Sequence, residues 1–244
     1  NNLMKTAPEP WDGWRTGWFQ DVRRTRIPAY VCPSDTSMSC ANIGNCNYPV
    51  SMGCNVGWGV SSSQRNGVFE LDKERKIGDI QDGTSNTILI GEQRLGDHNN
   101  ANYRPGDVVR GQPFWMDQNQ IGYPQTGVVY DGPAIEAYGI QCDTISAKSN
   151  HHSHGGREWI APMPAQTAFN TLAPPNWRYP SCQECTGCGW MDSRGIFPAR
   201  SNHSSGAMHG LADGSVRMIT NDIGGRVYCM MGNRADGLAV QIDP

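Results

Sequence analysis

The sequence predicts an α+β fold that is mostly β, with a pilin-like antiparallel sheet covered by long, disulfide-tied loops. Three observations favour this class. Gly and Pro number 29 and 16 among 244 residues, and only 18% of residues are charged, which is typical of turns and loops rather than long surface helices. Short β-branched runs recur between turn signals. Nine cysteines in such a chain indicate an oxidising compartment.

The predicted elements are short. The N-terminal part predicts a helix over residues 14–25, a strand over 27–32 and a disulfide-tied loop over 33–66. The middle predicts a strand over 67–71, a helical turn and polar loop over 77–86, a buried strand over 87–92 and short strands over 107–110 and 126–130. The remainder predicts brief regular structure over 156–195 and a strand over 215–219. The strands at 67–71, 87–92 and 215–219 are expected to carry the sheet.

Each prediction has a local reason. Trp14, Trp18 and Val22 recur at helical spacing. The run from residue 87 to 92 is apolar and β-branched, which is typical of a buried strand. Residues 215–219 alternate between apolar and polar and follow Asp213-Gly214, a turn signal, so they predict a strand with one buried face.

The cysteines predict disulfides whose pairing the spacing does not fix, with one thiol left over because nine is odd. Cys182, Cys185 and Cys188 are spaced like part of an iron–sulfur or zinc site, but bridges to three different segments are the favoured interpretation. The full set is Cys32, Cys40, Cys46, Cys54, Cys142, Cys182, Cys185, Cys188 and Cys229.

Charge and hydropathy exclude some classes. The net charge of -3 argues against a nucleic-acid partner. No apolar run reaches 18 residues, so we expect no membrane span in this chain. No nucleophile, base and acid can be assembled from the spacing, so we expect the protein not to be an enzyme and to have no catalytic residues.

Several motifs occur in a fixed order. They are Cys32-Pro33-Ser34-Asp35, the run from Ile80 to Ile88 that ends near Glu92, Phe169-Asn170-Thr171, Pro174-Pro175-Asn176, an H-x9-D-G pattern from His203 to Asp213-Gly214, and Asn233-Arg234-Ala235-Asp236-Gly237. Over residues 10–240 they resemble the DUF1559 family of planctomycete proteins, also labelled as family 10 of solute-binding proteins.

That resemblance implies an exported protein with a pilin-like leader and a long apolar helix, both absent from this chain. We therefore expect a single domain over 1–244, located outside the cell or on its surface. The implied role is a pilin- or pseudopilin-like, type II secretion-like structural subunit of a filament or surface assembly, with other copies as partners. The alternative is an extracellular carbohydrate- or solute-binding module, which the eight Trp residues favour.

Candidate metal ligands lie on polar turns. Asp82 and Asn86 stand in an oxygen-rich loop that suits structural calcium, the one cofactor considered; the alternative is self-capping of the turn. His203 and Asp213 can meet if the chain folds back, to bind a metal or only to pin a loop. Residues 151–154 hold three imidazoles, which can bind a transition metal or form a solvated loop.

Overall fold

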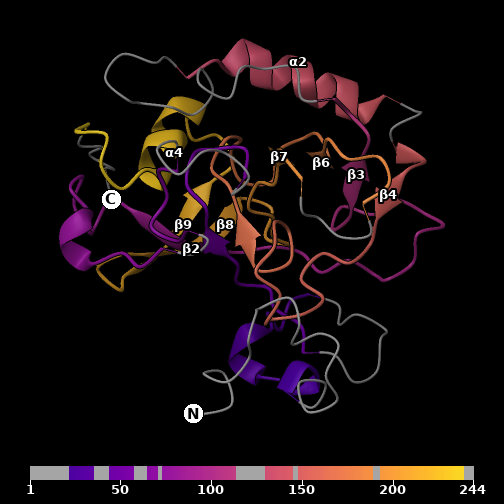
Figure 1. Cartoon of the computed structure of the whole chain (residues 1–244), viewed down its shortest axis with the longest axis horizontal. Coiled ribbons are helices and arrows are strands. Elements are labelled where there is room, and N and C mark those ends of the chain that lie inside the picture. The colour runs from indigo at the N-terminus through magenta and orange to yellow at the C-terminus, as the bar shows by residue number, and fades with distance from the viewer. Residues whose placement is uncertain are drawn as a thin grey trace.

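The computed structural model describes residues 22–35, 44–57, 65–70, 73–113, 130–144, 148–188 and 193–238. Two sheets and a few short helices form an α+β fold there (Figure 1), which confirms the predicted mostly β class. No helix in these ranges is both long and apolar enough to cross a bilayer. The strands are β1 (Val50–Ser51), β2 (Ile88–Gly91), β3 (Val108–Arg110), β4 (His151–His152), β5 (Ala168–Phe169), β6 (Ser181–Gln183), β7 (Gly195–Ile196), β8 (Gly206–Leu211) and β9 (Val216–Thr220). The helices are η3 (Pro28–Tyr30), η5 (Ile77–Asp79), α2 (Gly132–Asp143) and α4 (Gly225–Gly232).

The larger sheet has the strand order β5-β1-β2-β8-β9. Its β8–β9 hairpin closes at the predicted turn, where Gly214 has φ +86°, a conformation that glycine adopts without strain. The Asp213 carboxylate accepts the N–H of Ser215 and fixes this turn. Pairing is antiparallel except between β1 and β5, which run parallel.

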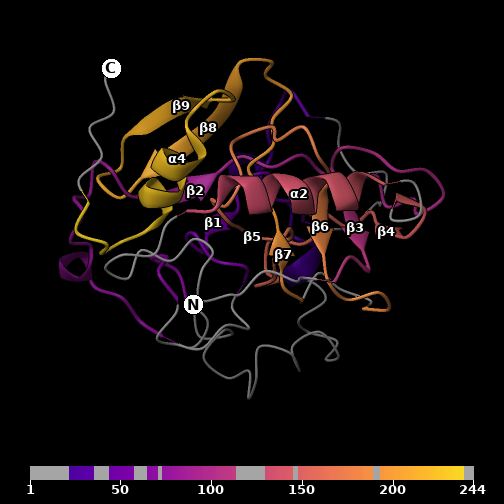
Figure 2. The same ribbon diagram turned by 90° about the horizontal axis from the view of Figure 1, so that it is seen from above.

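Helix α4 covers one face of this sheet. Its Tyr228 and Met231 pack in a buried cluster with Ile88 of β2 and Phe169 of β5. Figure 2 shows α4 beside β8 and β9. Because successive strand residues point to opposite faces, the apolar side chains on the other face of the sheet are partly or largely exposed.

The smaller sheet has the order β4-β3-β6-β7 and packs against α2. Ile135 and Tyr138 of the helix are buried with Ile196 of β7. A disulfide from Cys142 to Cys182 ties the end of α2 to β6. The helix and this sheet therefore form one unit beside the larger sheet, as both views show (Figure 1, Figure 2).

The disulfides differ from the expectation of four bridges with one thiol left over. Among the cysteines that the structure describes, three bridges form, namely Cys54–Cys229, Cys142–Cys182 and Cys185–Cys188, so the last two cysteines of the closely spaced run pair with each other. Cys32 and Cys46 keep buried free thiols. The segment around them is held by hydrogen bonds to distant residues instead, and Cys40 lies outside the described residues.

Three of the six predicted strands are confirmed. The runs at 87–92 and 107–110 contain β2 and β3, the run at 215–219 overlaps β9, and the helical turn predicted near residue 77 is η5. Regular structure over 156–195 is brief, as expected.

Two predicted strands are wrong. Residues 67–70 join no ladder, because the Arg234 guanidinium donates to the carbonyls of Arg65 and Gly67. Residues 27–32 contain the 3-10 turn η3, because Pro28 fixes φ near the helical value at its first position. The strand predicted over 126–130 and most of the helix over 14–25 lie outside the described residues.

We predict that the Cys54–Cys229 disulfide contributes more to the free energy of unfolding than the Cys185–Cys188 disulfide does. The Cys54→Ala/Cys229→Ala variant opens a link with a sequence separation of 175, whereas Cys185→Ala/Cys188→Ala opens one with a separation of 3. Because closure entropy grows with loop length, the first pair should cost about 5 kcal/mol of unfolding free energy and the second about 2 kcal/mol. Denaturant unfolding of both variants checks this. Equal losses would contradict it.

We also predict an acid-sensitive core at His209. Its Nδ1 donates to the Ala207 carbonyl at 2.9 Å, and its Nε2 accepts from the Tyr228 hydroxyl at 2.8 Å. One donating and one accepting nitrogen are the pattern of a neutral imidazole. Burial lowers the pKa of His209 to about 4. The unfolded chain then binds the extra proton, so stability is lost as pH falls from about 6.5 towards 4, by roughly 3 kcal/mol for this group.

The control is His209→Gln, whose amide can also donate and accept but does not titrate in this range. Unfolding free energies measured from pH 7 to pH 4 should fall less steeply in His209→Gln than in the unsubstituted chain. Identical slopes would show that His209 does not contribute to the acid sensitivity.

Candidate functional site

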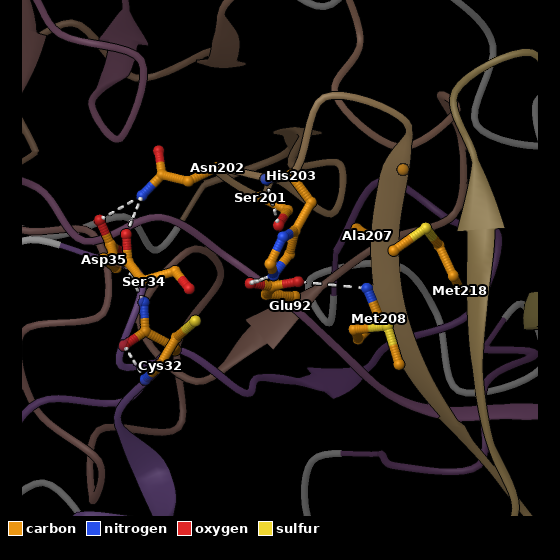
Figure 3. A network of polar contacts seen from close by, with 12 residues as sticks. Cys32, Ser34, Asp35, Glu92, Ser201, Asn202, His203, Ala207, Met208 and Met218 are labelled. Atoms are coloured by element: carbon orange, nitrogen blue, oxygen red, sulfur yellow. Dashed lines mark hydrogen bonds and ion pairs between the residues drawn. The ribbon is translucent and has the colours of Figure 1, made fainter.

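Three segments of the chain bring a thiol, a carboxylate and an imidazole together. Cys32 follows η3, Glu92 follows β2, and His203 precedes β8. One ligand atom from each lies within 4.8 Å of the other two, and His203 Nε2 is 4.0 Å from Glu92 Oε1. Figure 3 shows the imidazole directed at the Glu92 carboxylate.

The cluster is buried on one side and open on the other. Cys32 and Glu92 are 5% and 3% exposed, whereas 41% of the His203 side chain is accessible. Glu92 Oε2 accepts the backbone N–H of Met208 at 3.2 Å. A carboxylate buried to this degree is costly unless it is paired or coordinates a cation.

The Asp35 carboxylate holds the three segments in place. Its Oδ2 accepts the Asn47 amide at 2.7 Å and the backbone N–H of Leu95 at 2.8 Å, and its Oδ1 accepts the Asn202 amide at 3.0 Å. Leu95 is three residues after Glu92, and Asn202 is next to His203. One side chain thus links all three cluster segments, and Figure 3 shows its contact with Asn202.

Asn47, which is fully buried, adds a second set of links. Its side-chain oxygen accepts the N–H of Cys32 at 2.9 Å, and its amide also donates to the Gln93 carbonyl at 2.8 Å. The backbone of Cys32 is therefore tied to the residue that follows Glu92.

The backbone around His203 is fixed at both of its polar groups. Its N–H donates to Ser201 Oγ at 3.0 Å, and its carbonyl accepts from the Asn176 amide at 3.2 Å. Asn176 Oδ1 also accepts the N–H of Ser201 at 2.7 Å. The loop that carries the imidazole is ordered by these contacts.

The Tyr48 hydroxyl lies against this cluster and is hydrogen-bonded to the Cys32 side chain. Burial, together with the nearby Cys32 and Glu92, raises the pKa of Tyr48 to about 12. The phenol therefore stays neutral at physiological pH.

An apolar groove of about 660 Å³ runs beside the cluster over the open face of the larger sheet. Tyr30 and Trp159 form its wall, with ring centroids 6.1 Å apart in an edge-on arrangement. Val50, Ile90 and Met208 lie along its floor. Because the backbone of Met208 binds Glu92 while its side chain lines the groove, the two features share a strand.

The predicted calcium ligands occupy other places. Both Asp82 oxygens accept backbone N–H groups, from Asp236 at 2.7 Å and Gly237 at 2.8 Å, and the Asn86 amide donates to the Asp82 carbonyl at 3.4 Å. These contacts are caps, although they reach a distant segment as well as the turn itself. Calcium at this loop remains a prediction.

His203 and Asp213 lie at opposite ends of β8, so the structure does not bring this predicted pair together. Asp213 is exposed, and hydrogen bonds from Ser215 lower the pKa of its carboxyl. His203 contacts Glu92 instead.

The histidine run splits across two environments. His151 Nε2 lies 3.5 Å from the Asp107 carboxylate, whose pKa burial raises to about 6. The His154 ring stacks on His98 at 4.4 Å and meets His152 edge-on at 3.9 Å, between ring centroids. Burial lowers the pKa of His154 to about 3.

Within the described ranges, Cys32, Glu92 and His203 are the set of His, Cys, Asp or Glu residues whose ligand atoms converge. In this set His203 is a metal ligand candidate predicted from the sequence, whereas Cys32 and Glu92 were not predicted as its partners. Both belong to motifs that were noted, and what the sequence lacked was a sign that these motifs meet.

Comparison with known proteins agrees with these motifs. The profile of the family described as "Protein of unknown function (DUF1559)", SBP_bac_10, matches residues 2–226, which include all three cluster residues. Neither the curated proteins nor the solved structures contain a match. With nearly the whole chain matched, the protein belongs to the DUF1559 family.

Proposed function

We propose that this protein is an exported, pilin-like structural subunit of an extracellular assembly. The observation that carries the proposal is the open apolar face of the larger sheet. Helix α4 packs on the opposite face, so the sheet is covered by a helix on one side only among the described residues. The pilin-like analogy places a packed helix on such a sheet, and here an apolar segment of a second copy would fill that position.

The open face is continuous across four strands. Val50 of β1 pairs with Ile90 of β2, Ile90 with Gly210 of β8, and Gly210 with Val216 of β9. Gly210 has no side chain, so it leaves the row concave between its apolar neighbours. In the adjacent row of the hairpin, Met208 pairs with Met218.

The exposure of this face is high for apolar side chains. Val216 is 65% exposed, Met218 43% and Ile90 39%. Contiguous exposed apolar residues of this kind are typical of protein interaction sites. Strand β9 is also an edge strand of the sheet, so the backbone N–H and C=O groups on its outer side can pair with another strand.

The remaining features agree with a structural role outside the cell. Three disulfides in a chain of this size are typical of exported proteins. The role requires no catalysis, in keeping with the expectation that the chain is not an enzyme.

A second candidate function is binding of an extracellular solute, including carbohydrate. Tyr30 and Trp159 favour it, since aromatic walls suit stacking on apolar or sugar rings. The groove volume of about 660 Å³ also falls in the range of small-molecule sites. The two candidates use the same groove but differ in their occupant.

We predict that Val216→Asp weakens self-association about tenfold or more, because a charged side chain would be buried unpaired in the contact. Sedimentation at increasing protein concentration, together with negative-stain electron microscopy, measures the effect. The matched control is Arg217→Asp, one residue along β9, whose side chain points to the other face of the sheet.

The assembly proposal fails if the unsubstituted chain stays monomeric at high concentration, or if both variants behave alike. Trp159→Ala separates the two candidates. Loss of solute binding by this variant in a chain that remains monomeric would favour the solute-binding function.

A further inference from the structure

We infer that Cys32, Glu92 and His203 form a binding site for one divalent transition-metal ion of the zinc type. The three side chains come from segments far apart in sequence, yet their ligand atoms lie within 4.8 Å of one another. In a tetrahedral zinc site the ligand atoms are about 3.3–3.6 Å apart. The separations must therefore shorten by at most about 1.5 Å to reach that geometry, and the accessible His203 ring has the most room to move.

The donor set selects the kind of ion. Calcium and magnesium require six or more oxygens, whereas this cluster offers one sulfur, one nitrogen and one carboxylate. Zinc accepts thiolate, imidazole and carboxylate ligands together. Three protein ligands leave a fourth position, and the 41% accessible side chain of His203 leaves one side of the cluster open to a solvent ligand.

Charge balance supports the same assignment. Binding of a divalent ion would displace the proton of the Cys32 thiol, which places a thiolate beside the Glu92 carboxylate in a region where both residues are at most 5% exposed. A dication neutralises both charges, which removes the main cost of burying Glu92. The single backbone donor from Met208 and the imidazole at 4.0 Å do not achieve this neutralisation.

A nucleophilic role for the thiol fits less well. Attack on a substrate requires access to the sulfur, but Cys32 is 5% exposed and the Tyr48 hydroxyl lies against it. The accessible member of the cluster is the His203 imidazole. Two buried ligands and one accessible ligand are the arrangement expected of a metal site with one open coordination position.

The surrounding contacts fix the ligands before any ion binds. Asp35 links the segments of all three ligands, and Asn47 anchors the backbone of Cys32. Positioning residues of this kind contribute to metal affinity through the ligands that they orient. Asp35 is therefore a positioning residue of this site and not a ligand.

The test is cobalt titration of the chelator-treated, disulfide-intact protein. Cobalt(II) substitutes for zinc and gives a thiolate-to-cobalt charge-transfer band together with the intense visible bands of tetrahedral coordination. We expect one equivalent to bind the unsubstituted chain, and zinc to displace it. Cys32→Ser should lose the charge-transfer band, and His203→Gln and Glu92→Gln should each bind about tenfold more weakly or worse.

The matched control is Cys46→Ser, which removes the neighbouring buried free thiol and should keep the band. Because Cys32→Ser can disturb the core, His203→Gln is the decisive variant, since its side chain is largely accessible. Asp35→Asn should bind cobalt about 10–100-fold more weakly but show the same band at saturation, which a general loss of structure would not give.

Three results would overturn the inference. They are a native protein that binds no stoichiometric cobalt or zinc, a charge-transfer band that survives in Cys32→Ser, and peptide mapping that finds Cys32 in a disulfide. None of these results depends on whether the chain self-associates, so this site and the proposed assembly can fail separately.

Discussion

The hydrogen bonds to the Asp35 carboxylate are the interaction on which the functional face of this protein depends. The carboxylate accepts three N–H groups from three separate segments, those of Asn47, Leu95 and Asn202. Bonds to an ionised acceptor are stronger than neutral ones, so one short side chain replaces the regular structure that these loops lack. Without it, the turn carrying Cys32 would be held near Glu92 and His203 by fewer contacts, such as those of Asn47 with Cys32 and Gln93.

The same face of the larger sheet serves both proposed roles. Strand β8 presents the Met208 side chain to the apolar groove and the Met208 backbone to Glu92. Met208 and Tyr48 thus lie between the cluster and the groove. An ion bound at the cluster would stiffen the end of the sheet where a second copy is proposed to pack.

Local sequence predicted the elements whose contacts are local. The β-branched run of β2 and the Asp213-Gly214 hairpin were recognisable because their own residues determine their conformation. Helix α2 was missed because its apolar periodicity is weak, although Asp131 as a capping residue marks its start. Residues 67–70 failed as a strand because Arg234, some 167 residues later, binds their segment.

The candidate site illustrates the same limit. The motif around Cys32 and the one ending near Glu92 were visible, but they meet through hydrogen bonds such as that from the Leu95 N–H to Asp35, which spans 60 positions. Spacing in sequence carries no information about a contact of that range. The calcium prediction used Asp82 and Asn86, which lie in one short loop of the sequence. Closeness in sequence did not identify the ligand atoms that converge in the structure, those of Cys32, Glu92 and His203.

The most direct measurement is anomalous X-ray diffraction at the zinc absorption edge, from crystals grown with one equivalent of zinc per chain. The account predicts one anomalous peak, bonded to Cys32 Sγ, Glu92 Oε1 and His203 Nε2, with the Asp35 hydrogen bonds intact. The absence of a peak at that position, or a peak among His98, His152 and His154 instead, would contradict it.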